Sequence, residues 1–329
     1  MSARCTAAGA ATALGGLALA AGAVTTVGRL VPRVPGVAPD TWAMATSFTD
    51  VGAFAHLAAV LGLGSGALLG PSRGRLAAAA LALVLTGVHL SWVVPGYVAD
   101  DRPAAGPGEL RVLAQNLLFG GADPAALLVA AQEVDVLVLT EITEPARQAL
   151  EDAGVGARFG HQAGSSSLPS TGAAGTRVYS RYPLRSDGVL DAGLGEQHWR
   201  VELDVPELGP VTVVAVHPQR PVRGGSGWAV EQEQLRQALP RDRTVVAGDF
   251  NAVDSHPSLR RLRADGFRDS DDLLGAGWNP TYPAQGRIPP LIAIDHVLVS
   301  DDLTATAFRT ITVPGTDHRG VLATVALRA

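Results

Sequence analysis

The chain has 329 residues, in which 31 acidic residues outnumber 26 basic ones and give a formal net charge of −5. All the basic residues are arginines, and residues 101–329 alone carry a net charge of −7. An acidic, lysine-free surface lacks the basic stripe with which most proteins hold a nucleic-acid backbone, so composition weighs against that partner. The single cysteine, Cys5, excludes a disulfide framework and a cysteine-based metal site.

Three apolar runs in the first hundred residues predict transmembrane helices. Residues 7–27 consist almost wholly of Ala, Gly, Leu and Val, and residues 51–70 and 76–98 contain no Asp, Glu, Lys or Arg. Each run is near the ~20 residues that a membrane span requires. A secretory signal peptide is the alternative for the first run, but the two further runs favour an anchor over cleavage and release.

The arginines that flank these runs bear on the orientation in the membrane. With the N-terminus in the cytoplasm the count is balanced, with Arg4, Arg73 and Arg75 inside and Arg29, Arg33 and Arg102 outside. The compact basic loop at residues 71–75 favours the cytoplasmic side. We therefore expect an integral plasma-membrane protein, with the lipid bilayer as a partner and everything after residue 99 outside the cell. No feature of the sequence indicates a protein partner.

Residues 100–109, with two prolines, are predicted to link the anchor (residues 1–99) to a soluble domain (residues 110–329). Strands are expected at 110–118, 134–140, 177–180, 199–205, 211–216, 245–247, 294–300, 308–313 and 320–327. Helices are expected at about 123–132, from 145, at about 228–239 and from about 257. Several neighbouring strands are joined by connections too short for a helix, so we expect two mixed sheets with helices outside.

Polar residues recur where the apolar strands end or begin. They are Asn116, Glu141, His217, Asp249 with Asn251, Asp295, and Asp317 with His318. Taken alone, the stretch from Gly248 to Asn251 also fits an Asx-rich turn. Six such points, all Asn, Asp, Glu or His, fit an oxygen-ligand site for Mg²⁺ with histidine partners. The sequence has no HExxH, Gly-x-Ser-x-Gly or Walker motif, so other common hydrolase classes have no support.

These residues lie within seven short motifs of a known superfamily. The motifs are Ala114-Gln115-Asn116, Leu139-Thr140-Glu141, Tyr179-Ser180-Arg181-Tyr182-Pro183, Val216-His217-Pro218, Gly248-Asp249-Phe250-Asn251, Ile294-Asp295-His296-Val297 and Thr316-Asp317-His318-Arg319. In order and approximate spacing they resemble the endonuclease/exonuclease/phosphatase superfamily across residues 110–329. That resemblance implies a four-layer α/β sandwich with metal-dependent phosphoesterase activity. Thr140 departs from the pattern, since the superfamily usually has Gln before the metal-binding Glu.

The resemblance also implies a role for each matching residue. Glu141 would bind Mg²⁺ directly, with Asn116 and Asp317 completing the site; Mn²⁺ is the alternative ion. Asp249 would orient and deprotonate the attacking water, while Asn251 holds the phosphate. His318, oriented by Asp295, would contact the phosphoryl oxygens. His217 would be the general acid or a further phosphate contact.

The substrate is the least constrained part of the prediction. Arg220 and Arg223 could clamp a second phosphate, although an exposed, solvated loop explains them equally well. The anchor with an outward domain also resembles actinobacterial membrane proteins linked to glycopeptide-type resistance, which implies a cell-wall lipid phosphate. We expect a phosphoesterase acting on a lipid-linked or small phosphorylated substrate. The alternatives are a tethered nuclease and a non-catalytic sensor on the same scaffold, and the complete residue set weighs against the sensor.

Overall fold

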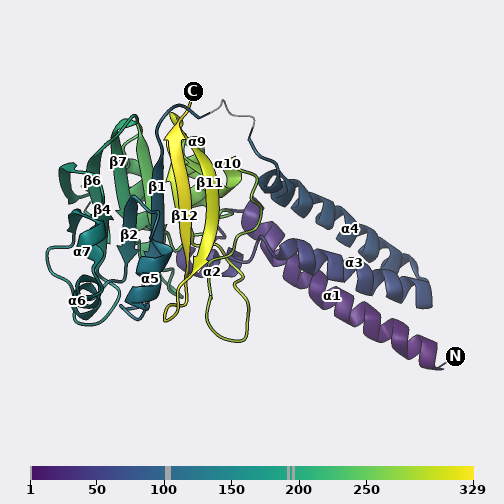
Figure 1. Ribbon diagram of the computed structural model, residues 1–329. Helices are drawn as coiled ribbons and strands as arrows, with labels where there is room; N and C mark the ends of the chain where they lie inside the picture. Colours follow the sequence, from purple (N-terminus) through teal and green to yellow (C-terminus); the bar gives the residue numbers. More distant parts are fainter. Residues whose placement is uncertain (1, 101–104, 191–192, 195–196) are drawn as a thin grey trace.

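The computed structural model describes residues 2–100, 105–190, 193–194 and 197–329. Three long helices project from one side of a domain that is built on two β-sheets (Figure 1). Residues 101–104 of the predicted 100–109 linker, which include Arg102, lie outside the described residues.

The long helices are α1 (Ser2–Leu30), α3 (Gly52–Leu69) and α4 (Arg73–Val93), with the short 3-10 helix η1 (Val94–Tyr97) after α4. All three are long and apolar enough to cross a membrane, which agrees with the predicted anchor. Glycines let α1 and α3 approach closely: a Cβ on Gly15 would lie 2.6 Å from the backbone nitrogen of Leu63. The first helix extends beyond the predicted run at both ends.

A fourth N-terminal helix, α2 (Pro39–Thr46), lies between α1 and α3 and was not predicted. Pro39 occupies its first turn, where the missing N–H removes no helical hydrogen bond. Ala43 from this helix is buried in a cluster that also contains Val214 and Phe250. The segment between the first two long helices therefore packs against the two-sheet domain.

Each sheet has six strands. The first has the order β11 (Leu303–Thr312), β12 (Arg319–Leu327), β1 (Leu110–Asn116), β2 (Val136–Thr140), β4 (Thr176–Ser180), β3 (His161–Gly164). The second has the order β5 (Leu184–Val189), β6 (Trp199–Val205), β7 (Gly209–Val216), β8 (Thr244–Asp249), β10 (Asp295–Val299), β9 (Arg268–Asp269). The β1–β2 and β7–β8 pairs are parallel, and both sheets are mixed as expected.

Alternating side chains divide the core into layers. On β2, Val136 and Val138 face the cluster between the sheets, whereas Leu137 and Leu139 face the helices outside. The helices of the first sheet are α5 (Pro124–Ala130), α6 (Glu144–Asp152) and α7 (Val155–Arg158); those of the second are α8 (Gly227–Ala238) and α9 (Pro257–Ala264). A short helix, α10 (Ser270–Leu273), follows β9. The predicted four-layer α/β sandwich is confirmed.

Candidate active site

The polar residues predicted at six strand ends meet at one edge of the sandwich. The parallel pairs β1–β2 and β7–β8 finish at this edge, and the antiparallel strands β10 and β12 begin there. Register places Asp249 opposite Asp295 on neighbouring strands, and Asn116 opposite Thr140, one residue before Glu141. Residues from both sheets therefore share one polar cluster.

Asn116 connects the two sheets through its side-chain amide. Its Nδ2 donates to Glu141 Oε1 at 3.1 Å and to Asp249 Oδ2 at 3.0 Å. The second oxygen of Glu141 accepts a hydrogen bond from the backbone N–H of Phe119 at 2.9 Å. Asn116 Oδ1 in turn accepts from the N–H of Leu118 at 2.9 Å. One amide thus holds two carboxylates of different sheets close together.

Backbone conformations at this edge explain why particular residues stand there. Glu141 and Asn251 have positive φ angles of 53° and 48°, which non-glycine residues adopt rarely and mostly where the surroundings impose them. Gly248 has φ 145°, and a Cβ at this position would lie 2.1 Å from the carbonyl oxygen of Val216. Only glycine fits there, so β8 can turn its Asp249 side chain into the site.

His318 and Asp295 form a buried pair beside Asp249. His318 donates from Nδ1 to Asp295 Oδ2 at 2.8 Å, and its Nε2 lies 3.9 Å from Asp249 Oδ2 and from Asp317 Oδ1. Burial opposes the charge of His318, but the carboxylates of Asp295 and Asp249 outweigh it and raise the pKa of His318 to about 10. The favoured state is an imidazolium whose Nε2–H points at the carboxylate cluster.

The acidic cluster fits a divalent cation. Asp317 Oδ1 is buried and has no hydrogen-bond partner in the described part of the chain; His318 Nε2 lies 3.9 Å from it. Ligand atoms of Asp249, Asp295 and His318 lie within 4.8 Å of one another and form a candidate metal site. Within this group, His318 Nδ1 and Asp295 Oδ2 already share a hydrogen bond.

His217 is a second histidine beside the same carboxylates. Its Nε2 is 3.7 Å from Glu141 Oε1 and 3.8 Å from Asp249 Oδ2. Its backbone N–H donates to His198 Nδ1 at 3.4 Å. Within the described residues its own Nδ1 has no hydrogen-bond partner. The Nε2 atoms of His217 and His318 therefore both lie within 4 Å of Asp249 Oδ2.

The model of the Endonuclease/Exonuclease/phosphatase family matches residues 113–318, which include every residue of this cluster. The chain belongs to that family. It is a hydrolase that acts on phosphoesters, and the family in general depends on divalent metal ions. No curated protein matches the chain.

Solved structures of the family share the fold at low sequence identity. An endonuclease/exonuclease/phosphatase from Beutenbergia cavernae has 22% identity and a TM-score of 0.52, with 67% of this chain and 72% of that chain covered. One from Bacteroides vulgatus has 15% identity and a TM-score of 0.53, with 67% and 100% covered. TDP2 from D. rerio, complexed with a single-strand DNA product, has 15% identity and a TM-score of 0.53, with 67% and 99% covered.

Three side chains of α8 form hydrogen bonds with backbone groups next to the site residues, and the sequence analysis did not predict them. Trp228 Nε1 donates to the carbonyl of Asn251 at 2.9 Å, and Gln232 Nε2 donates to that of Phe250 at 2.6 Å. Glu231 Oε2 accepts from the N–H of Gln219 at 2.8 Å. Their hydrogen-bond partners are backbone groups, which every residue carries, so the sequence does not identify these partners. Buried polar residues on the inner face of an amphipathic helix were the available signal.

Asn251 contacts this cluster, whereas the two predicted arginines lie in the loop that follows His217. The side-chain Nδ2 of Asn251 donates to the carbonyl of Pro218 at 3.0 Å, while its N–H donates to Asp249 Oδ1 at 2.8 Å. Arg220 and Arg223 are exposed, and neither has an ion-pair partner among the described residues. Burial and Asp317 raise the pKa of Tyr282, which packs on His318 at 5.0 Å between ring centroids, and the nearby Arg220 opposes that rise.

His296, the neighbour of Asp295 on β10, makes its contacts away from the cluster. Its Nδ1 contacts Asp269, and its Nε2 donates to the carbonyl of Ala252 at 2.9 Å.

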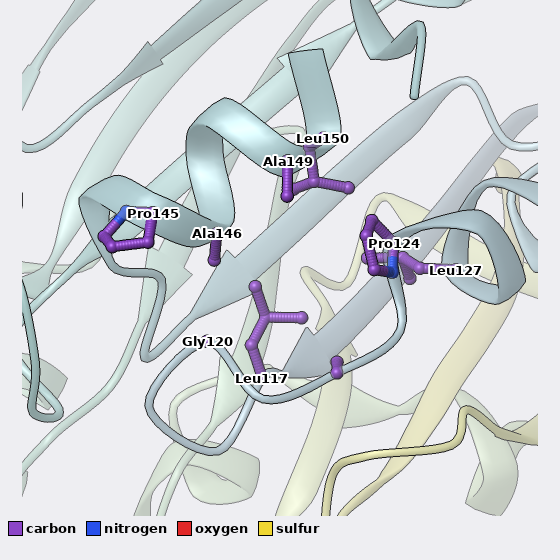
Figure 2. Close-up of a pocket in the computed structure, with 9 residues that line it drawn as sticks. Leu117, Gly120, Pro124, Leu127, Pro145, Ala146, Ala149 and Leu150 are labelled. Atoms are coloured by element: carbon purple, nitrogen blue, oxygen red, sulfur yellow. The ribbon is translucent and has the colours of Figure 1, made fainter. Parts of the chain in front are cut away.

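An apolar hollow between α5 and α6 is separate from the polar cluster (Figure 2). It is lined by Leu117, Gly120, Ala122, Pro124, Leu127, Pro145, Ala146, Ala149 and Leu150, with no titratable side chain.

Proposed function

We propose that the protein is a membrane-anchored, Mg²⁺-dependent phosphoesterase that hydrolyses a lipid-linked or small phosphorylated substrate at the outer face of the membrane. The observation that carries this proposal is that two groups of polar side chains meet at the same edge of the sandwich. The carboxylates of Glu141 and Asp249 are bridged by Asn116, and the charged Asp295–His318 pair faces the same oxygen of Asp249.

Glu141, Asn116 and Asp317 would hold the metal ion. Carboxylate and amide oxygens are the ligands that Mg²⁺ prefers, and Mn²⁺ accepts the same set. When bound, the ion supplies positive charge that polarises the phosphoryl group. The Oδ1 of Asp317, which has no hydrogen-bond partner among the described residues, supports this assignment.

The protein's own residues would carry the proton transfers. The N–H of Asn251 donates to Asp249 Oδ1, and Oδ2, which already accepts from Asn116 Nδ2, would use its second lone pair to orient a water and accept its proton. As the water oxygen bonds to phosphorus, the bond from phosphorus to the leaving oxygen breaks, and His217 Nε2 would protonate that oxygen. His318 would donate from Nε2 to a phosphoryl oxygen and stabilise its charge in the transition state. The side chain of Asn251 would hold the phosphate.

The neighbourhood of the site supports a membrane-linked substrate with more than one phosphate. The loop of residues 218–226, here called the arginine loop, carries Arg220 and Arg223 at its exposed surface. Guanidinium groups bind phosphate oxygens in pairs, which suits a pyrophosphate. The same loop contacts α2, which lies between two candidate membrane spans. A phosphate carried by a lipid would thus meet the arginines near the bilayer.

Phosphate release by the full-length protein in detergent with Mg²⁺ tests this function. The substrates are a lipid pyrophosphate, a phospholipid, and single-stranded and duplex DNA, with Asp249→Ala as the matched inactive control. Release from a lipid that disappears in the variant and after chelation supports the proposal. Cleavage of DNA alone would make the protein a tethered nuclease. No hydrolysis and no Mg²⁺ binding would leave the sensor alternative.

A separate measurement tests the orientation. A reporter that is active only outside the cytoplasm should be active when it is fused after Ala329. We propose an odd number of spans with a cytoplasmic N-terminus, which places this position outside the cell. Activity of a cytoplasm-specific reporter at the same position would reverse the orientation and move the substrate to the inner leaflet.

A further inference from the structure

The chain between the first two long helices is held at one end of the membrane bundle. Helix α1 ends at Leu30 and α3 begins at Gly52, so both ends of this segment are fixed by candidate membrane spans. Helix α2 lies within the segment and packs on the two-sheet domain. A contact made by α2 is therefore a contact between the anchor and the catalytic domain.

Asp40, in the first turn of α2, is the most buried charged group of this segment, with 0% exposure. Its carboxylate accepts backbone hydrogen bonds at 3.4 Å from Val222, Trp228 and Ala229. Within the described residues, no arginine forms an ion pair with it. Its charge is satisfied by backbone N–H groups, two of which belong to the first turn of α8.

Two further hydrogen bonds hold the arginine loop to α2. The N–H of Asp40 donates to the carbonyl of Gly225 at 3.2 Å, and the N–H of Gly224 donates to Thr41 Oγ1 at 2.8 Å. Gly225 is required at this contact, because a Cβ there would lie 2.8 Å from Asp40 Oδ2. The loop and α2 therefore touch on both sides of the carboxylate.

The carboxylate takes the place of a helix cap. Ser226, at the N-cap position of α8, makes no side-chain cap hydrogen bond. A negative charge at a helix N-terminus satisfies free N–H groups and complements the helix dipole. Helix α8 in turn holds the backbone of Phe250 and Asn251 through Gln232 and Trp228. Asp40 is thus two contacts away from the residue that would hold the phosphate.

We propose that Asp40 is a positioning residue of the active site, through which the membrane anchor holds the arginine loop and the first turn of α8 in their binding geometry. This role rests on the proposed function. The arginine loop would bind substrate equally in the ground state and the transition state, so loss of Asp40 should raise KM more than it lowers kcat.

The test compares full-length variants in detergent on geranyl pyrophosphate, a soluble lipid pyrophosphate whose second phosphate can reach the arginine loop. Asp40→Ala should raise KM by about fivefold, the scale of a lost helix cap. Asp40→Asn keeps one acceptor oxygen and should fall between it and the wild type. Gly225→Ala perturbs the same contact from the loop and should raise KM with the anchor unchanged.

Asp123→Ala is the matched control. Asp123 caps α5 by accepting from Ala126 N at 2.7 Å, so its loss removes an aspartate cap far from the arginine loop. It should leave KM unchanged. A KM in Asp40→Ala and Gly225→Ala no higher than that of this control would overturn the proposal.

Hydrogen exchange separates this proposal from the proposed function. In Asp40→Ala the amides of Val222, Trp228 and Ala229 should exchange faster, whereas Asp123→Ala should affect only α5. If the wild type hydrolyses nothing, the proposed function fails, and exchange still decides whether the contact holds the loop. Wild-type exchange rates at these three amides in a folded Asp40→Ala variant would refute it.

Discussion

We expect the packing of the anchor on the two-sheet domain to depend on pH through His256. The imidazole is buried between α9 and α2, where Nδ1 accepts from the N–H of Val253 at 3.1 Å and Nε2 donates to the carbonyl of Ala43 at 3.0 Å. One acceptor and one donor fit the neutral ring. Burial lowers the pKa of His256 to about 4, with the Ala43 carbonyl opposing and Arg260 adding to the fall.

A pKa below the unfolded value means that acid favours the unfolded chain. The unfolded imidazole takes up a proton near its ordinary pKa of about 6.5, whereas folded His256 does so only near 4. The stability that the neutral ring provides is complete above pH 6.5 and is lost as the pH falls toward 4. At pH 5 the loss amounts to about 2 kcal/mol in the free energy of unfolding.

Thermal unfolding of the full-length protein in detergent at pH 7 and pH 5 measures this loss against His256→Gln, which does not titrate. The effect of His256 is the difference in acid sensitivity between the wild type and the variant, because two other groups titrate in both proteins. Burial raises the pKa of Asp50 and Asp272 to about 6, and these groups stabilise the fold as the pH falls. His161→Gln, at an exposed position, controls for histidine removal. Equal acid sensitivity in the wild type and His256→Gln would refute the reasoning.

Three substitutions test the site itself. Glu141→Gln should weaken Mg²⁺ binding by more than about tenfold, as measured by metal titration; an unchanged affinity would move the ion elsewhere. Asp295→Asn should lower kcat by about a hundredfold or more, because His318 loses the carboxylate that orients and charges it; steady-state rates near wild type would remove the pair from the mechanism. Gly248→Ala would place a Cβ 2.1 Å from the carbonyl of Val216 and should destabilise the fold by about 3 kcal/mol or more. A wild-type melting temperature would contradict that last expectation.

The sandwich could be predicted because its central strands are buried on both faces or alternate regularly. The strand at 136–140 carries valines toward one layer and leucines toward the other, and the apolar run before Gly248 is a strand of the same kind. The strands β3 and β5 were missed for the opposite reason. Both lie at sheet edges, and their residues are mostly exposed, so no apolar pattern marks His161–Gly164 or Leu184–Val189.

The cluster at the sheet edge could also be predicted, because the chemistry of a phosphoester site demands particular residue types. Asn116, Glu141 and Asp249 stand at strand ends, and strand ends that share an edge bring such residues together however far apart they lie in the chain. Support from α8 had no such signal. Trp228 and Gln232 bond to backbone carbonyls, which every residue offers, so only the folded geometry identifies their partners.

The composition of the chain changes near residue 99, but residues before this point pack in the same core as residues after it. Ala43, from the segment between two membrane helices, is buried in the same cluster as Val214 and Phe250 of the second sheet. Asp40 satisfies N–H groups of a helix that begins nearly two hundred residues later. Hydropathy indicates whether a segment is surrounded by lipid or by water. A shared core and a shared helix cap show which other parts of the chain the segment packs against and stabilises. For this protein the second property makes the anchor part of the architecture of the active site.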